Sequence, residues 1–400
     1  MIVPEELTAM SLPDDMVCEI LAHVEDMGDL FRCARTCKRW SRLADDVRRG
    51  RLQWTSSLVS GFFTKKGRAK HLIPTPGSVF GPDRRFLGSF FRGGTRDLSC
   101  ATPLAARHGL LLVLLDSCDA RARSNQITVH LAVCNLLAGT CDELPPLERG
   151  WRYGKSGYVI FTDADCSSND KQQSLLPWGY STLFKVIVIY SSVRDDEPCI
   201  LHTFSYGEGR WNTPTNLVDE DIEFYGCGLL KHSNAVVCRG TAHWLIGYYP
   251  SQSHLHIINV DAETCHVSLT KIMNPTHDIL SGTYEEPQLI VSADKTLSLL
   301  YLQKPGLQVK ICTWQVSEGS ESGGRWLCSR VIELKAPKQI QEEEMHLTFL
   351  AEKNGTLLVK DNCMNLYAAD LRTGVMKSLM HCGKVTYWKV VPFEIYWPVC

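Results

Sequence analysis

The sequence predicts a mainly β protein with a small α-helical module at its N-terminus. Apolar residues follow a helical period only between Leu12 and Asp46. From about Leu52 onward, short strand-like apolar runs separated by turn residues replace that period. Groups of these runs recur through the rest of the 400 residues, a length that has room for one large domain beside a small module.

The composition is typical of soluble globular proteins. Hydrophobic residues make up 44% and charged residues 22% of the chain, which argues against wholesale disorder and against a fibrous protein. The 42 basic and 44 acidic side chains leave a net charge of −2. This balance gives no overall electrostatic reason to bind nucleic acid or an acidic membrane, and we expect neither as a partner.

The first ten residues, MIVPEELTAM, are acidic and lack the positive start and apolar stretch of a secretory signal. We expect residues 1–10 to be disordered. The longest aliphatic run, Leu110 to Leu115, is far shorter than the ~20 residues that span a bilayer. These features favour a cytoplasmic or nuclear protein, in which the 17 cysteines are mostly small buried hydrophobes rather than disulfide partners.

The first predicted helix follows Leu12. Its apolar residues form a broad stripe on one face, namely Met16, Val17, Ile20, Leu21 and Val24. Pro13 suits the first turn, where its missing N–H is not needed, and Ser11 is a candidate cap. Gly28 is expected to break the helix.

Two shorter helical patterns follow and complete a three-helix unit of about forty residues. They are marked by Leu30, Phe31, Cys33 and Ala34, and by Cys37, Trp40, Leu43 and Ala44. Modules below ~40 residues usually need a disulfide, a metal or a partner to be stable. We therefore expect a further surface, from this chain or another one, to complete the core of the unit.

The string LPDDMVCEILAHV, followed by DLFRCARTCKRWSRLADD, resembles the F-box. The residues that carry the resemblance are Leu12, Pro13, Glu19, Ile20, Leu21, Cys37, Trp40 and Leu43. The resemblance implies that residues 11–50 bind a Skp-type adaptor, which in turn holds a cullin scaffold, a RING subunit and a ubiquitin-conjugating enzyme. Thr36 departs from the pattern, since a β-branched aliphatic residue is common there.

The resemblance also assigns adaptor-binding residues. They are Leu12, Pro13, Met16, Val17, Ile20, Leu21, Leu30, Cys33, Cys37, Trp40 and Leu43. Each of them has an alternative role in the internal core of the module. Trp40 is the best candidate for an energetic anchor, because a buried indole dominates many interfaces.

Residues 51–400 contain repeated groups of predicted strands. The clearest group extends from His346 to Leu379, with turns at Asn354-Gly355, Asp361-Asn362 and Thr373-Gly374. Asn-Gly at a two-residue reversal is the strongest short-range hairpin signal, because both central positions need a positive φ. This group is predicted to be a four-stranded antiparallel meander.

Four comparable groups lie upstream, at intervals of roughly fifty to seventy residues, a spacing suited to kelch-like propeller blades of ~50 residues. The last apolar stretch, KVTYWKVVPFEIYW, is expected to pair with strands between Trp54 and Phe91 and so close a ring. We therefore predict a β-propeller of about six four-stranded blades, with five or seven blades, or two stacked sheets, as alternatives. The segment VCNLLAGTCDELPPL also resembles the F-box-associated propeller domains of plant proteins.

Motifs for catalysis and for cofactor or metal binding are not found. The sequence contains no G-x-S-x-G elbow, Walker loop, H-E-x-x-H motif or C-x-x-C pair. His254 and His256 share a strand face without a third ligand, so a plain strand surface is favoured over a metal site. Solvated loops are favoured for the acidic groups Asp163 with Asp165, Asp195 with Asp196 and Asp219 to Asp221, and for the basic cluster Lys65, Lys66, Arg68, Lys70, His71, Arg84 and Arg85.

We therefore predict a non-catalytic substrate receptor of a Skp-cullin-F-box (SCF) ubiquitin ligase, which links a target protein to the ligase for ubiquitination and degradation. An interaction scaffold not coupled to ubiquitin transfer is the alternative, and a propeller hydrolase is a third class. Aromatic residues beside turns are candidate target contacts. They are Trp151, Tyr153, Trp178, Tyr180, Tyr248 and Tyr249.

Overall fold

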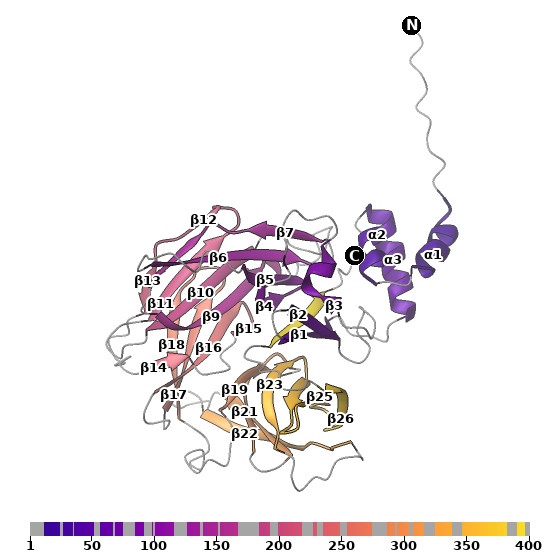
Figure 1. Ribbon diagram of the computed structural model, residues 1–400. Coiled ribbons are helices and arrows are strands. Elements are labelled where there is room, and N and C mark those ends of the chain that lie inside the picture. Colours follow the sequence, from indigo (N-terminus) through magenta and orange to yellow (C-terminus); the bar gives the residue numbers. More distant parts are fainter. Residues whose placement is uncertain are drawn as a thin grey trace.

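The computed structural model consists of a helical module followed by sheets arranged in a ring (Figure 1). The structure describes residues 12–24, 27–34, 36–51, 57–66, 69–74, 85–91, 98, 101–115, 126–136, 139–150, 153–166, 184–192, 199–217, 227–229, 235–248, 254–273, 286–292, 294–303, 307–315, 325–337, 346–381 and 390–396.

The module contains three helices, as predicted. They are α1 (Asp14–Ala22), α2 (Met27–Ala34) and α3 (Lys38–Arg51). Two local predictions were wrong. Pro13 caps α1 from outside the helix, with an extended ψ of 152°, instead of lying in its first turn. Gly28 lies inside α2, and α1 ends six residues earlier at Ala22, where the His23 side chain and backbone bond to the last carbonyls.

The sheets form six blades, each with at least four antiparallel strands. Blade 1 contains β27 (Val391–Tyr396), β1 (Ser57–Lys66), β2 (Ala69–Pro74) and β3 (Arg85–Phe86), followed by a short 3-10 helix, η1 (Leu87–Phe90). Blade 2 contains β4 (Thr102–Arg107), β5 (Leu110–Leu115), β6 (Gln126–Asn135), β7 (Thr140–Glu143) and β8 (Leu147–Gly150).

Blade 3 begins with β9 (Tyr153–Thr162) and the one-turn helix α4 (Asp163–Cys166), and continues with β10 (Phe184–Ser192), β11 (Cys199–Ser205), β12 (Arg210–Trp211) and β13 (Thr215–Leu217). Blade 4 contains β14 (Cys227–Leu229), β15 (Val236–Cys238), β16 (Thr241–Tyr248), β17 (His254–Asp261) and β18 (Val267–Met273).

Blade 5 contains β19 (Gln288–Val291), β20 (Leu297–Leu302), β21 (Gln308–Gln315) and β22 (Arg325–Glu333). Blade 6 contains β23 (Thr348–Lys353), β24 (Thr356–Lys360), β25 (Asn365–Asp370) and β26 (Met376–His381). The six-bladed propeller predicted from the sequence is therefore confirmed, and the stacked-sheet alternative is wrong.

The first strand of each blade lies on the inside of the ring. The inner strands of neighbouring blades contact one another around the circle, and in blade 4 this position is shared by β14, which contacts β9, and β15, which contacts β19. In blade 1 the inner strand is β27, between β23 and β4. Because β27 pairs antiparallel with β1, the C-terminal strand closes the ring against the first strand after the helices, as predicted. Packing between the blades buries several apolar clusters rather than one central core.

Two-residue turns with positive φ join an inner strand to the next strand in three blades. The Asn354-Gly355 turn has φ values of 51° and 78°, as the sequence predicted for a hairpin reversal. His108-Gly109 and Arg239-Gly240 form the same kind of turn in blades 2 and 4. All three turns lie at the face of the propeller where the inner strands end.

Candidate adaptor-binding face

Helix α1 carries apolar side chains on two of its faces. Val17 and Leu21 are buried, with exposed fractions of 1% and 0%. Leu12, which lies just before the helix, and Met16 and Ile20 on it are exposed to 43%, 47% and 45%. Because Met16 and Ile20 are four residues apart, they lie one above the other on the same side of the helix. The part of the apolar stripe formed by Leu12, Met16 and Ile20, here called the outer stripe, is left uncovered.

The inner side of the module packs against the propeller. Val17, Leu21, Leu30 and Leu43 belong to one buried cluster that continues into blades 1 and 2, including Phe63 of β1. The chain itself therefore supplies the surface that completes this side of the three-helix unit. Figure 1 shows α1 on the side of α3 away from the strands, which leaves α1 at the outside of the molecule.

Ion pairs attach the start of α1 to α3. Asp14 accepts hydrogen bonds from Nε of Arg39 at 2.6 Å and from Nη2 of Arg42 at 2.8 Å. The hydrogen bond from Arg39 is the main cause of the lowered pKa of the Asp14 carboxyl group. Arg39 also donates to the backbone carbonyl of Leu12, so it holds the first residue of the outer stripe next to α3.

The remaining predicted adaptor-binding residues differ in exposure. Pro13 and Cys37 are exposed, whereas Cys33 and Trp40 are half-buried and pack against the buried cluster. Burial raises the pKa of the Cys33 thiol, which keeps that thiol protonated. Of the eleven assigned residues, those whose side chains reach the surface are therefore Leu12, Pro13, Met16, Ile20, Cys33, Cys37 and Trp40.

The predicted target-binding aromatic residues remain untested. Trp151, Trp178, Tyr180 and Tyr249 lie outside the described residues. Tyr153 begins β9 and Tyr248 ends β16, but their side chains are also outside the description. The structure instead brings Tyr206, Phe184 and Phe204 together at a groove between blades 2 and 3, which the sequence analysis did not single out. The only sequence signal for it is the aromatic residue before the Gly207-Glu208-Gly209 turn.

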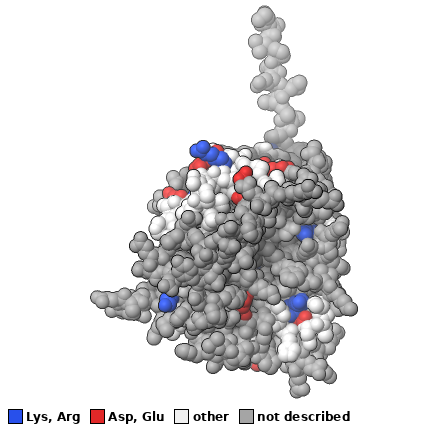
Figure 2. Space-filling view, turned by 60° about the vertical axis from the view of Figure 1, so that its left-hand side comes forward, with Lys and Arg blue, Asp and Glu red and all other residues white. Residues whose placement is uncertain are grey.

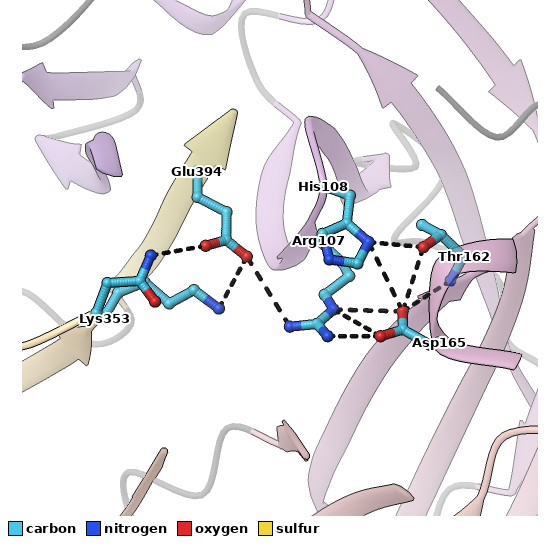
Figure 3. Close-up of polar contacts among 7 residues, drawn as sticks. Arg107, His108, Thr162, Asp165, Lys353 and Glu394 are labelled. Atoms are coloured by element: carbon cyan, nitrogen blue, oxygen red, sulfur yellow. Dashed lines mark hydrogen bonds and ion pairs between the residues drawn. The ribbon is translucent and has the colours of Figure 1, made fainter. Parts of the chain in front are cut away.

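A second group of polar residues lies where the inner strands end, at one mouth of the propeller (Figure 3). Arg107 at the end of β4 donates from Nε to Asp165 Oδ1 at 3.2 Å. Lys353 of β23 forms a 2.9 Å ion pair with Glu394 of β27, and Arg107 approaches the same carboxylate at 3.9 Å. Two cations face two carboxylates, so the charges of this mouth cluster balance within the protein.

The acid–base properties of the mouth cluster are those of buried, paired groups. Burial alone would raise the pKa of Asp165, but the charge and hydrogen bonds of Arg107 outweigh it, and the pKa is lowered. His108 has its pKa lowered to about 4, first by burial and then by the charge of Arg107, so its ring is neutral near pH 7. The ring lies 2.7 Å from the hydroxyl of Thr162.

Three predictions of exposed surface were wrong. Asp165 is buried because Arg107 pairs with it across blades. Lys70 is buried in the β1–β2 hairpin, not in a solvated loop, and the ring of His71 packs on Phe86 at 4.4 Å. His256 of β17 is 6% exposed and faces inward rather than lying on an open strand surface. Asp195, Asp196 and residues 219–221 lie outside the described residues.

The described part of the chain contains no cluster of three or more histidine, cysteine or acidic side chains arranged to hold a metal ion. Twelve cysteines whose side chains are described carry free thiols, and Cys134, Cys238 and Cys312 are buried as predicted. No helix among the described residues has the length and apolarity to cross a membrane. Among the described residues on the face shown in Figure 2, acidic and basic side chains are scattered, and some of them lie beside one another.

Comparison with known proteins identifies the helical module. Residues 9–49 match the F-box-like family, and the six-bladed β-propeller follows this domain. F-box domains generally bind Skp-type adaptors. No curated protein matches the chain.

Among solved structures, a mutant of AofleA from Arthrobotrys oligospora is 12% identical with a TM-score of 0.39, and the match covers 84% of this chain and 90% of that one. The β-propeller domain of the Trilobed protease from Pyrococcus furiosus is 9% identical with a TM-score of 0.37, covering 82% and 99% of the two chains. A post-proline cleaving enzyme from Rickettsia typhi is 10% identical with a TM-score of 0.34, covering 94% and 58%. Likenesses this distant carry no inference about activity.

Proposed function

We propose that this chain, in which an F-box-like domain at residues 9–49 precedes a six-bladed β-propeller, is a substrate-recognition subunit of an SCF-type ubiquitin ligase. The F-box-like domain binds a Skp-type adaptor and, through it, the cullin and RING subunits. The propeller binds a target protein. The chain performs no chemistry of its own, and it works in the cytoplasm or the nucleus.

The observation that carries this proposal is the outer stripe of α1. Met16 and Ile20, one turn apart on α1, and Leu12 just before the helix are each more than two-fifths exposed, on a module whose opposite side is already covered. Exposed apolar patches of this kind mark interaction sites. An adaptor that covers the outer stripe removes that apolar area from water, which favours binding by ~25 cal/mol for each Å² buried.

We assign the predicted adaptor-binding residues to two roles, direct contact with the adaptor and positioning of the helices. Leu12, Met16 and Ile20 make direct contact, together with the exposed Pro13 and Cys37 and the half-buried Cys33 and Trp40. Val17, Leu21, Leu30 and Leu43 position the helices from within the buried cluster. The cluster also ties the module to blades 1 and 2, and this attachment raises the effective concentration of a bound target near the conjugating enzyme.

Co-purification with a Skp-type adaptor tests the adaptor-binding step. The double substitution Met16→Asp with Ile20→Asp charges the outer stripe without touching the buried cluster. We expect adaptor binding to weaken at least about tenfold, because removal of a central interface anchor typically costs ~2 kcal/mol or more. Val331→Asp is the matched control, since Val331 is an apolar residue of β22 that is 57% exposed, far from the helices in sequence.

Intact protein that binds no Skp-type adaptor, or an outer-stripe variant that binds as well as the Val331→Asp control, would contradict the proposal. Thermal unfolding of each variant serves as a check on folding. Trp40→Ala is a less clean test, because Trp40 also packs against the buried cluster.

Ubiquitin transfer separates the ligase subunit from an interaction scaffold that also binds an adaptor. Proteins captured on the propeller should receive ubiquitin in the reconstituted ligase, and the outer-stripe variant should abolish that transfer while target capture continues. Capture of a target together with adaptor binding, but without transfer in the wild-type complex, would favour the scaffold.

A further inference from the structure

Two cysteines lie opposite each other in blade 2. Cys134 of β6 and Cys141 of β7 are direct partners in the register of the two strands. Their sulfur atoms are 3.0 Å apart, about 1 Å farther than the ~2.05 Å of a disulfide bond. The two thiols therefore touch in the reduced protein, and only a small approach separates them from a covalent bond.

The hydrogen bonds between β6 and β7 place the two cysteines at a position that a disulfide can bridge. The N–H of Leu144 donates to the carbonyl of Leu131 at 2.9 Å, so these two residues form a hydrogen-bonded pair. Such pairs alternate with non-hydrogen-bonded pairs along an antiparallel ladder, and Cys134–Cys141 is the third pair further along the same register. It is therefore a non-hydrogen-bonded pair, in which the Cα atoms lie ~4.5 Å apart, within the ~4.4–6.8 Å that disulfides span. A bond between the sulfurs needs no displacement of the strands.

The two thiols differ in their access to solvent. Cys134 is 0% exposed, whereas Cys141 is partly exposed. The hydrogen bond with Cys141, followed by burial, raises the pKa of the Cys134 thiol well above its ordinary value, which keeps that thiol protonated near neutral pH. An oxidant in solution therefore reaches Cys141 first, and Cys134 is the neighbour that can react with the product.

The cysteine pair lies where the helical module joins the propeller. Cys134 belongs to the buried cluster that contains Leu21 and Leu30 of the helices, and Cys141 packs against this cluster. A covalent link between β6 and β7 would therefore form beside the residues that attach the module to blade 2, and it would leave the outer stripe of α1 unchanged.

We propose that Cys134 and Cys141 form a reversible oxidation site, at which a peroxide converts the two thiols to a disulfide between β6 and β7. The inference goes beyond the proposed function and requires neither the adaptor nor a target. In a reducing compartment the disulfide forms only while peroxide is present, and thiol reductants remove it afterwards.

The reaction has two steps. The Cys141 thiolate attacks one oxygen of hydrogen peroxide, the O–O bond breaks, and Cys141 becomes a sulfenic acid, while the departing hydroxide takes up the proton released by the Cys141 thiol to give water. The Cys134 sulfur then attacks the Cys141 sulfur, the S–O bond breaks, and the Cys134 proton leaves with the hydroxide as a second water. The two sulfurs together lose two electrons, which the peroxide gains.

Peptide mass mapping of the full chain tests the site. Trypsin cuts after lysine and arginine, so residues 124–149 are released as one peptide whose cysteines are Cys134 and Cys141 alone. The protein is treated with hydrogen peroxide, then denatured and labelled with N-ethylmaleimide. We expect this peptide to take up no label and to be lighter than the unlabelled reduced peptide by two hydrogen atoms. Treatment with dithiothreitol after removal of the peroxide should restore labelling of both cysteines.

Oxidation of the unfolded chain separates the effect of the fold from that of proximity in sequence. The two cysteines are only seven residues apart, so a disulfide can also form by chance in urea. The measured quantity is the ratio of disulfide to Cys141 overoxidised to sulfinic or sulfonic acid. We expect this ratio to be at least about five times higher in the folded protein, because the strands hold the thiols in contact.

Substitutions test the separate roles of the two thiols. Cys141→Ser should leave Cys134 a thiol after oxidation, because the buried sulfur has lost the partner that reacts first. Cys134→Ala should let the Cys141 sulfenic acid persist, so that dimedone labels it. Cys363→Ser, at an exposed cysteine between β24 and β25, is the matched control and should form the disulfide as the wild type does. Thermal unfolding checks the folding of each variant.

Four outcomes would overturn the proposal. They are N-ethylmaleimide on both cysteines of the oxidised peptide, a disulfide that dithiothreitol does not reduce, a disulfide ratio no higher in the folded protein than in urea, or oxidation of Cys134 in Cys141→Ser to the extent seen in the wild type. Adaptor co-purification is a separate measurement, so a failure here is distinguishable from a failure of the proposed function.

Discussion

At the scale of single residues, the consequences of burial are clearest at the mouth of the propeller. Glu352 is the next-to-last residue of β23, beside the mouth cluster, and its carboxylate accepts a hydrogen bond from the N–H of Gly355 at 2.8 Å. Burial raises the pKa of Glu352, and the hydrogen bond from Gly355 lowers it. Burial is the larger effect, so the pKa rises from 4.5 to about 7. The carboxyl group that accepts the hydrogen bond from the Asn354-Gly355 turn is therefore harder to ionise than an ordinary glutamate.

The raised pKa of Glu352 makes a prediction about stability and pH. A group whose pKa is higher in the folded state contributes stability below its unfolded value of 4.5, and this contribution is lost as pH rises through about 7. Glu352→Gln keeps an acceptor for Gly355 but cannot ionise. We expect it to raise the free energy of unfolding by about 1–2 kcal/mol above pH 7 and to change it little near pH 4.5, as measured by urea unfolding. Equal effects at both pH values would contradict this account.

The contribution of His108 to stability changes with pH in the opposite direction, and it does so below neutral pH. Its pKa is lower in the folded protein, about 4, than its ordinary value of 6.5. The stability it contributes is complete above pH 6.5 and is lost as pH falls toward 4. We expect His108→Gln, which does not titrate, to make the unfolding free energy less dependent on pH in this window, measured by urea unfolding against wild type. An unchanged pH profile would contradict the expectation.

At the scale of elements, turns decide how closely the blades pack. Gly374, in the turn before β26, has a φ of +73°, and a Cβ atom there would meet the backbone carbonyl oxygen of Glu333 at 2.1 Å. This turn therefore brings blade 6 against the last strand of blade 5. The sequence predicted the turn from Thr373-Gly374, but the contact across blades is a property of the folded ring.

Gly374→Ala should destabilise the protein by about 2–4 kcal/mol, because it adds a backbone clash to the cost of a positive φ. Gly209→Ala is the control for the φ term alone, since Gly209 has a φ of +66° and nothing within 4 Å of the added atom. We expect Gly209→Ala to cost only about 1 kcal/mol. Thermal unfolding measures the stability of both variants. Equal losses of stability would show that the backbone at Glu333 can move to accept the added Cβ atom without an energetic penalty.

At the scale of the whole molecule, Glu394 connects the two ends of the ring. Besides the ion pairs with Lys353 and Arg107, its carboxylate accepts from Asn354 Nδ2 at 3.0 Å, and its backbone carbonyl accepts from Gly109 N at 2.9 Å. One side chain of the last strand therefore bonds to blade 6 on one side and approaches blade 2 on the other. Closure of the propeller depends on this side chain as well as on the β27–β1 pairing.

Glu394→Ala should loosen the closure. It leaves the partly buried Lys353 and Arg107 without this carboxylate, and we expect a loss of about 2–4 kcal/mol in unfolding free energy. Hydrogen exchange should accelerate in β27 and β1 before it does in β20 and β21 of blade 5. Glu333→Gln, at an exposed carboxylate of β22, is the control. Uniform acceleration across all blades would mean that Glu394 does not act at the closure.

Sequence periodicity determined the helical module, the strands and the blade repeat. The helical spacing of Met16, Ile20 and Val24, and the Asn354-Gly355 reversal, are local signals that a chain carries wherever it folds. The F-box-like motif is also local, since it lies within the contiguous residues 9–49. The turns at His108-Gly109 and Arg239-Gly240 escaped the sequence analysis because their first residues are not typical of a φ above zero.

Only the tertiary structure decided which apolar and charged groups are covered. Val17 and Ile20 are both apolar residues of the same helix, yet one is buried and the other is left open because α3 covers only one side of α1. Arg107, Asp165, Lys353 and Glu394 are far apart in the chain and meet only when the blades pack around the ring. Local spacing of residues determines which segments form helices and strands. Which side chains are buried or paired depends on contacts between segments far apart in the chain, and the packing of the blades determines those contacts.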